Sequence, residues 1–454
     1  MYRVRRLAVA PIAAAGVLLL ATACSTPGSS SQSGPAPSEK PQDISTNPAQ
    51  AGKVTLRVWD QEVRGGQNAQ MTQLNKEFMA KYPNVTIERT SKSFADLKTT
   101  LKLALSGNNP PDVVQANQGY PDMVSFVKAG MLRPLDAYSS VYGWGRRYPA
   151  SLLNLNRVSN DGSHFGEGKL YGISQMGEYV GVYYNKSKLK ALGLQPPQTW
   201  SDFTSDLAKV KAAGQVPIQF GNLDKWPAIH TFGVIQGQTA GKQAVRNLVF
   251  GTGGKWTDPS TVQAAATLQD WAKKGYFPNG VNGIGYDDAN KHFAAGQGVF
   301  LITGTWAAAD LKGPMGSSLG LMVPPSSTSS PVTTGGESLA FALTSKSKHA
   351  DVAAAYLNFI TNQHADDVMT NTGNLAAVSS PASQNLTAAS PEGQMVAGWS
   401  KLSNADGLVP YLDYSKPTFY DTITSALQKL IGGQTTPQQF ADTLQTDYAQ
   451  FHQQ

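Results

Sequence analysis

Between residues 53 and 115 the chain alternates twice between short runs of β-branched residues and amphipathic segments, and no other feature constrains the fold as strongly. Residues 54–59, 85–88 and 112–115 are predicted strands because they are short and rich in β-branched residues. Residues 71–78 and 94–105 are predicted helices because their apolar side chains recur every three or four positions. Two successive strand-helix-strand units imply parallel strands, so the sequence predicts an α/β fold.

Polar residues follow the first and third predicted strands. Asp60, Gln61 and Glu62 follow the first strand, and residues 117–120, which include Gln118 and Tyr120, follow the third. Parallel strands end at the same edge of a sheet, and ligands of open α/β sheets bind beyond that edge. The sequence therefore predicts that these side chains lie on one rim.

The later part of the chain continues the pattern without an internal repeat. Residues 179–184, 300–302 and 338–343 are predicted strands, and helices are predicted from residue 199, over 288–295 and over 352–360. The body from residue 53 to residue 454 has about 400 residues, more than one hydrophobic core normally serves, so two lobes are expected.

The N-terminus has the pattern of an export signal. Three arginines within the first six residues precede the apolar run 7–20, which is shorter than the roughly 20 residues of a spanning helix. Cys24, the only cysteine of the chain, follows small residues as in the bacterial lipobox, although Ala21 stands where leucine is preferred. Residues 1–23 are a predicted lipoprotein signal peptide and Cys24 a predicted lipidation site; the alternative is an ordinary signal with an incidental cysteine.

Composition narrows the remaining possibilities. Residues 24–52 are rich in Ser, Pro, Gly and Gln and are a predicted disordered tether, because such a segment buries too little apolar surface to fold. Beyond the signal, 34 basic residues face 31 acidic ones without a basic cluster, which argues against a nucleic-acid-binding protein. Together, the signal peptide, the lipidation site at Cys24 and the tether predict a body that is held at the outer face of a cell membrane by a lipid anchor.

Several motifs, in a fixed order, resemble one family. They are Pro111-Asp112-Val113-Val114, Leu170-Tyr171-Gly172-Ile173, Val182-Tyr183-Tyr184-Asn185-Lys186, Leu192-Gly193-Leu194 with Thr199-Trp200, Gly296-Gln297-Gly298, Gly304-Thr305-Trp306 and Gly335-Gly336. The body resembles the extracellular solute-binding proteins of carbohydrate ABC importers, the maltose-binding-like group. The resemblance implies a two-lobe periplasmic-binding-protein-like fold (type II) with several hinge crossings, a sugar in the cleft and a permease as partner.

The resemblance also implies how the chain divides. Residues 53–175 would begin the first lobe, 176–335 would begin the second, 336–400 would return to the first, and 401–454 would add C-terminal helices to the second. A monomer without a cofactor or a metal is expected.

Sugar sites combine aromatic plates, which stack on C–H faces, with groups that bind hydroxyls. The candidate plates are Trp226, Trp306 and Tyr420, at positions that the family uses for stacking. The polar candidates are Asp60, Gln61, Glu62, Gln118, Glu178 and Glu337, with Tyr120 on the same rim. The alternatives are core packing for the aromatic residues and solvated loop charge for the carboxylates. The sugar stays open, because Ala116 stands where an aromatic residue would be expected.

Enzymatic functions are the main rivals. The segment 336–340 looks like a nucleophile elbow but lacks the last glycine. A glycoside hydrolase needs two carboxylates across a cleft, and Glu62, Glu178 and Glu337 could converge. The six histidines are dispersed, which disfavours a metal site. The sequence favours a non-catalytic binding protein for an oligosaccharide, with a glycoside-acting enzyme or a peptide-binding protein as the alternatives.

Overall fold

The computed structural model describes residues 39–328 and 330–452, which lie within one compact unit, residues 33–454. The predicted signal peptide and Cys24 lie outside the described residues. Residues 39–52, the last part of the predicted tether, contact the body: Pro48 is buried, and the Asn84 side chain donates to the carbonyl oxygens of Pro48 and Gly52 at 2.9 and 2.7 Å. Within the described ranges, no helix is both long and apolar enough to cross a membrane.

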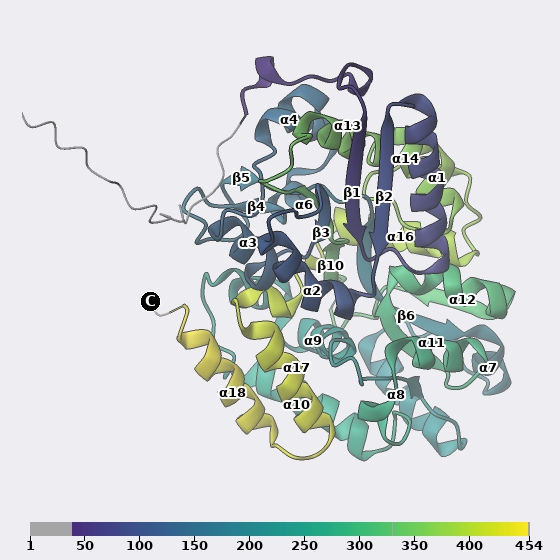
Figure 1. The fold of residues 1–454 in the computed structure, drawn as a ribbon. Helices are drawn as coiled ribbons and strands as arrows, with labels where there is room; N and C mark the ends of the chain where they lie inside the picture. Colours follow the sequence, from purple (N-terminus) through teal and green to yellow (C-terminus); the bar gives the residue numbers. More distant parts are fainter. Residues whose placement is uncertain (1–38, 329, 453–454) are drawn as a thin grey trace, which may run out of the picture. The chain divides into compact units, whose positions relative to one another are not determined.

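The first lobe is built on a four-stranded sheet in the order β11-β3-β1-β2 (Figure 1). Its strands are β1 (Val54–Asp60), β2 (Val85–Ser91), β3 (Val113–Ala116) and β11 (Ala340–Leu343). β1 pairs in parallel with β2 and with β3, whereas β11 is antiparallel to β3. The predicted parallel strands are confirmed, and the residues after β1 and β3 share one edge.

Helices α1 and α2 connect these strands. α1 (Gly65–Lys81) ends just before Tyr82-Pro83, where proline cannot continue a helix, and it buries Met71, Leu74 and Phe78. α2 (Phe94–Ser106) begins after Ser93, whose hydroxyl accepts from the Asp96 amide. Each fully buried apolar side chain stabilises the lobe by about 1.5–3 kcal/mol, so packing holds both helices against the sheet.

The second lobe is built on a sheet in the order β12-β10-β6-β8-β7, with β9 also paired to β6. Its strands are β6 (Gly177–Asn185), β7 (Ile218–Gln219), β8 (Phe300–Gly304), β9 (Leu319–Met322), β10 (Thr333–Glu337) and β12 (Leu408–Val409). All nine residues of β6 are buried. Val180 and Val182 contribute to one core cluster, and Tyr179 and Tyr183 to another, so both faces of β6 are covered.

The chain crosses between the two sheets near residue 177 and again between β10 and β11. Ile173 forms a β-bridge with Phe341 of the first sheet, whereas β6 begins at Gly177 in the second. β10 and β11 belong to different sheets although only two residues separate them. A Cβ on Gly335 would lie 2.5 Å from the Glu178 carbonyl oxygen, so a glycine is needed where β10 approaches β6.

Helices surround both sheets. Those of eight or more residues are α1, α2, α8 (Trp200–Ala212), α9 (Pro227–Phe250), α10 (Pro259–Lys273), α11 (Tyr286–Ala294), α12 (Ala308–Met315), α13 (Ala350–Ile360), α14 (Gln363–Asn371), α16 (Pro391–Asn404), α17 (Phe419–Ile431) and α18 (Pro437–Ala449). The shorter ones are α3 (Ser125–Lys128), α4 (Asp136–Tyr142), α5 (Trp144–Arg147), α6 (Ala150–Asn154), α7 (Lys186–Ala191) and α15 (Pro381–Gln384). Figure 1 shows the C-terminal helices α17 and α18 packed beside α9 and α10.

Helix α16 returns the chain to the second sheet. Its Met395 and Leu402 belong to the same core cluster as Leu319 and Leu321 of β9. The lobe boundaries inferred from the resemblance stay a prediction. Helix α16 spans the predicted boundary at residue 400 and packs against β9 of the second lobe.

Candidate functional site

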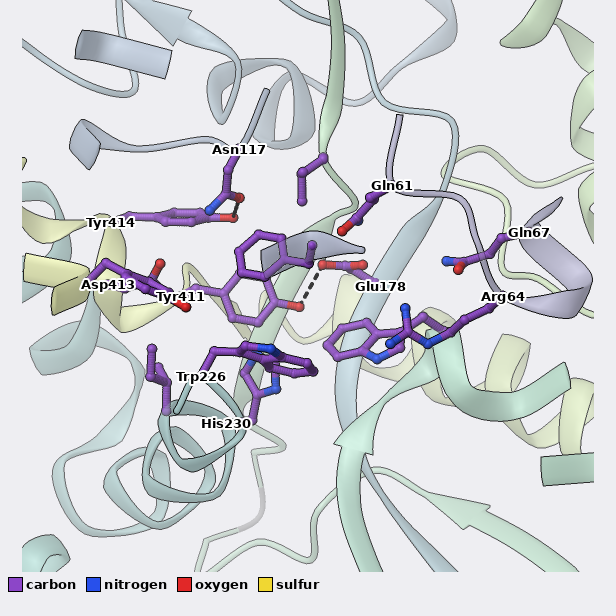
Figure 2. Close-up of a pocket in the computed structure, with 15 residues that line it drawn as sticks. Gln61, Arg64, Gln67, Asn117, Glu178, Trp226, His230, Tyr411, Asp413 and Tyr414 are labelled. Carbon is purple, nitrogen blue, oxygen red and sulfur yellow. Dashed lines mark hydrogen bonds between the residues drawn. The ribbon is translucent and has the colours of Figure 1, made fainter. Parts of the chain in front are cut away.

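A pocket lies where the edge after β1 and β3 faces the second lobe (Figure 2). Its empty space is about 630 Å³, including the solvent at its mouth. It is lined by Gln61, Arg64, Gln67, Phe94, Asn117, Glu178, Trp226, Ile229, His230, Trp306, Leu339, Tyr411, Asp413, Tyr414 and Tyr420.

Trp306 follows β8, and hydrogen bonds through the Tyr286 hydroxyl hold its ring in place. Its indole Nε1 donates to the Tyr286 hydroxyl at 2.6 Å, and that hydroxyl is 2.9 Å from the Thr303 hydroxyl. The Trp306 ring centroid is 6.4 Å from that of Trp226 and 5.2 Å from that of His230. Because these contacts fix the ring plane, Trp306 presents a preorganised apolar surface.

Gly304 makes room for this ring at the end of β8. A Cβ at position 304 would lie 1.9 Å from a carbon of the Trp306 ring, which no side chain can accommodate without moving the indole. The glycine is therefore part of what sets the position of Trp306.

Two tyrosines from the segment after β12 form another wall. The Tyr411 hydroxyl donates to Glu178 Oε1 at 2.8 Å. The Tyr414 hydroxyl is 3.0 Å from Asn117 Oδ1 and 3.1 Å from Gln118 Oε1, so it reaches from the second lobe to the loop after β3. The Tyr411 bond lies within the second lobe, whereas the Tyr414 bonds connect the two lobes beside the pocket.

Buried carboxyl groups lie in and behind the wall of the pocket. Burial raises the pKa of Glu178 to about 8, and the neighbouring Glu62 and Glu337 contribute in the same direction. Burial likewise raises the pKa of Glu62 to about 7 and that of Glu337 to about 8. Burial lowers the pKa of His230 to about 3, so this imidazole is neutral at physiological pH.

The loops after β1 and β2 contact the second lobe across the pocket. Arg64 donates to Asp287 Oδ1 at 3.2 Å, and its guanidinium lies 5.2 Å from the Tyr286 ring centroid. The Phe94 ring is 6.1 Å from Trp226 and 6.4 Å from Tyr420. The two lobes are therefore closed on each other in this structure.

Five of the ten predicted site residues line the pocket: Gln61, Glu178, Trp226, Trp306 and Tyr420. Four others, Asp60, Glu62, Gln118 and Glu337, are buried behind it and bind protein groups. Asp60 pairs with Arg89, Gln115 Nε2 donates to Glu62 at 2.6 Å, Gln118 donates to the Ser338 carbonyl at 2.9 Å, and Asn156 donates to Glu337 at 2.5 Å. These four support the lining residues.

The structure places Tyr120 away from this pocket. Its ring packs against Phe165 and Phe451, with centroids 6.2 and 4.9 Å away, and it lines a separate cavity. The chain turns after β3, so only Asn117 of that loop faces the pocket, although the whole loop lies at the predicted edge.

Ten lining residues were not among the predicted site residues, although one of them, Asn117, belongs to the segment 117–120 that was predicted to lie on the rim. They are Arg64, Gln67, Phe94, Asn117, Ile229, His230, Leu339, Tyr411, Asp413 and Tyr414. Tyr411, Asp413 and Tyr414 follow the two-residue strand β12, which is too short to recognise from periodicity. The dense aromatic and polar run 411–414 was the signal in the sequence that could have identified them.

Within the described ranges, no group of three or more His, Cys, Asp or Glu side chains is arranged to hold a metal ion.

A preorganised pocket between two α/β lobes that touch across it is the architecture of a solute-binding protein. The model of the bacterial extracellular solute-binding protein family matches residues 65–366, and the chain belongs to this family. The two-lobe fold expected from the sequence motifs is thereby confirmed.

Several known proteins are similar to this chain. It is 25% identical to the "Multiple sugar-binding protein" of Streptococcus mutans serotype c (strain ATCC 700610 / UA159), over 69% of this chain and 72% of that protein. A solved "Chitin oligosaccharide binding protein" matches with a TM-score of 0.77 and 24% identity, covering 88% of this chain and 100% of the other. The raffinose complex of RafE matches with a TM-score of 0.69 and 20% identity, over 88% and 100%.

Proposed function

We propose that this protein captures a sugar outside the cell and delivers it to the permease of an ABC importer. The observation that carries the proposal is the pocket itself, in which Trp226, Trp306 and Tyr420 stand beside the polar side chains of Gln61 and Glu178. Aromatic rings stack on the C–H faces of sugars, and amides and carboxyl groups bind their hydroxyls.

Binding by closure follows from where these groups lie. Gln61 comes from the loop after β1 of the first lobe, whereas Trp306 follows β8 of the second. A ligand that contacts both satisfies its partners only when the lobes are together, so binding shifts the population toward the closed form. The closed form is the one the permease would recognise.

The relatives support a sugar as ligand, since one is named for binding multiple sugars and two solved proteins for binding a chitin oligosaccharide or raffinose. For this chain we propose an oligosaccharide. We further propose a monomeric lipoprotein without catalytic activity, exported by residues 1–23 and anchored through Cys24, with the part of 24–52 that precedes residue 39 as a spacer, because residues 39–52 contact the body. A glycoside-acting enzyme and a receptor for a non-sugar solute such as a peptide are the competing functions.

Calorimetric titration of the purified protein against a panel of di- to tetrasaccharides tests the proposal, provided the sugars are analysed for cleavage afterwards. Saturable binding of one sugar class without cleavage is the expected result. Cleavage would identify a hydrolase instead. Binding of peptides with no response to any sugar would identify a receptor of another class.

Gly304→Ala is expected to weaken sugar binding by about three- to tenfold, or about 0.7–1.4 kcal/mol, because the new methyl group displaces the Trp306 ring. Gly313→Ala in α12 is the matched control, since a Cβ there meets no atom within 4 Å. The control should bind normally and unfold at the same or a higher temperature. Equal affinities for both variants, measured by titration, would contradict the role assigned to Gly304.

A further inference from the structure

Four buried carboxyl groups surround the pocket without an ion pair. They are Glu62, Glu178, Glu337 and Asp413, which are 0%, 9%, 2% and 6% exposed. Among the described residues, no Lys, Arg or His nitrogen lies within 4.0 Å of their carboxyl oxygens, whereas fourteen other pairs do come this close. Burying an unpaired carboxylate is costly, so these groups favour a partner with a positive charge.

The cations near the pocket pair with other carboxylates, and Lys98 Nζ also lies 4.3 Å from the ring centroid of the lining residue Tyr420. Arg64 pairs with Asp287 at 3.2 Å, Arg89 with Asp60 at 2.6 Å and Lys98 with Asp122 at 2.9 Å. Each of these charges is therefore balanced by a carboxylate outside the group of four. Arg64 is the cation that lines the pocket, and among the described residues no cation forms an ion pair with the group of four.

Two of the four carboxyl groups line the pocket itself. Glu178 accepts from the Tyr411 hydroxyl through Oε1, and no protein group donates to its Oε2 within the described part of the chain. Figure 2 shows this second oxygen on the side of the pocket where Gln67 and Arg64 lie. Gln67 is 3% exposed and lines the pocket, and its side-chain carbonyl oxygen has no hydrogen-bond partner. Glu178 Oε2 is thus an acceptor without a protein donor, and Gln67 Oε1 is a second such acceptor that the protein itself covers.

The aromatic walls add a second attraction for positive charge. Trp226, Trp306, Tyr411, Tyr414 and Tyr420 line the same space as Glu178 and Asp413. The faces of such rings carry negative potential and attract ammonium groups, most strongly in a desolvated site. A neutral sugar would use the stacking surface alone, whereas an ammonium group would also use this negative potential.

We propose that the ligand is an amino sugar whose ammonium group is held by Glu178 inside this aromatic pocket, with Asp413 as a second acidic wall. This inference rests on the proposed function and specifies its substrate class.

Binding of such a ligand would release a proton. Because the pKa of Glu178 is raised to about 8 by burial, its carboxyl group is mostly protonated at pH 7. The O–H bond breaks, the proton goes to the buffer, and the ammonium group pairs with the resulting carboxylate. Affinity for the ammonium sugar should therefore fall as the pH drops below about 8, by up to about tenfold per pH unit.

Charged and titratable neighbours shift the pKa values of Glu178 and Asp413. Glu178 is influenced by Tyr411, Glu62, Glu337 and Arg64, and of these Tyr411 and Arg64 favour its ionised form. Burial raises the pKa of Asp413 to about 6, with Lys98 opposing and Asp122 adding to the shift, so Asp413 is mostly ionised at pH 7. His230 is neutral and does not titrate in this range.

Matched sugars test the proposal in the wild-type protein. Glucosamine, galactosamine, mannosamine and the β-1,4-linked glucosamine dimer are each titrated beside their N-acetylated and hydroxyl counterparts at about pH 7, in two buffers of different ionisation enthalpy. For at least one skeleton we expect the ammonium form to bind more than about tenfold tighter than both counterparts, with close to one proton released.

Variants test whether Glu178 causes the preference for the ammonium form and the proton release. In Glu178→Gln the ratio of ammonium to hydroxyl affinity should fall to about one and the proton release should disappear, whereas the exposed Glu88→Gln on β2 should keep both. Binding of hydroxyl or acetylated sugars as tightly as the amines, without proton release, would overturn this inference and leave the proposed sugar-binding function standing. Failure of every sugar in both classes to bind would overturn the proposed function as well.

Discussion

Trp306→Ala is expected to weaken sugar binding by more than about tenfold, or about 1.4 kcal/mol, while leaving the fold intact. The indole is the plate whose orientation is fixed most completely, by the 2.6 Å bond to Tyr286 and by the ring contacts to Trp226 and His230. Truncation removes the stacking surface and leaves a void that water enters. Titration of the variant with the best sugar of the wild-type panel measures the loss.

Trp306→Phe separates stacking from hydrogen bonding. It keeps an aromatic plane but removes the Nε1 donor to Tyr286, so it should lose less affinity than the alanine variant. Circular dichroism and thermal unfolding confirm that both variants are folded. Unchanged affinity in folded Trp306→Ala would remove this residue from the binding site and shift the stacking role to Trp226.

The sequence was most informative where structure is local. The strands and helices from β1 to β3 were predicted because β-branched runs and helical spacing are read over a few residues, and Leu97, Leu101 and Leu105 are buried on one face of α2 as expected. The direction of a polar side chain at the sheet edge is a tertiary property. Gln61 faces the pocket, whereas the neighbouring Glu62 points into a buried network with Gln115, and nothing in the two residue types distinguishes them.

Tyr411 and Tyr414, which the sequence analysis did not predict as site residues, show a second limit of prediction from sequence. Tyr411 and Tyr414 reach the site because a two-residue strand, β12, pairs with β10, which is 71 residues or more upstream. Such a long-range pairing leaves no periodic pattern in the sequence. The predicted aromatic residues that line the pocket, Trp226, Trp306 and Tyr420, were found instead through positions that the family uses for stacking.

Arg89→Met is expected to lower the free energy of unfolding by about 3–5 kcal/mol, the cost of leaving a buried charge without its partner. Asp60 is 0% exposed, and Arg89 binds both of its carboxylate oxygens, at 2.6 and 2.9 Å. The same guanidinium donates to the Glu62 carbonyl oxygen at 2.6 Å, so it also fixes the loop that carries Gln61 into the pocket. Urea-induced unfolding, followed by tryptophan fluorescence, measures the loss.

Two further variants show whether the effect comes from the unpaired charge. Asp60→Asn combined with Arg89→Met should regain part of the stability, because the remaining buried group is no longer an anion. Lys274→Met breaks a pair with Asp270 in which the side chains are 54% and 50% exposed, and it should cost less than about 1 kcal/mol. A loss for Arg89→Met as small as that for Lys274→Met would mean that water compensates Asp60. The loop after β1 would then owe its position to the bonds that Gln115 makes with Gln61 and Glu62.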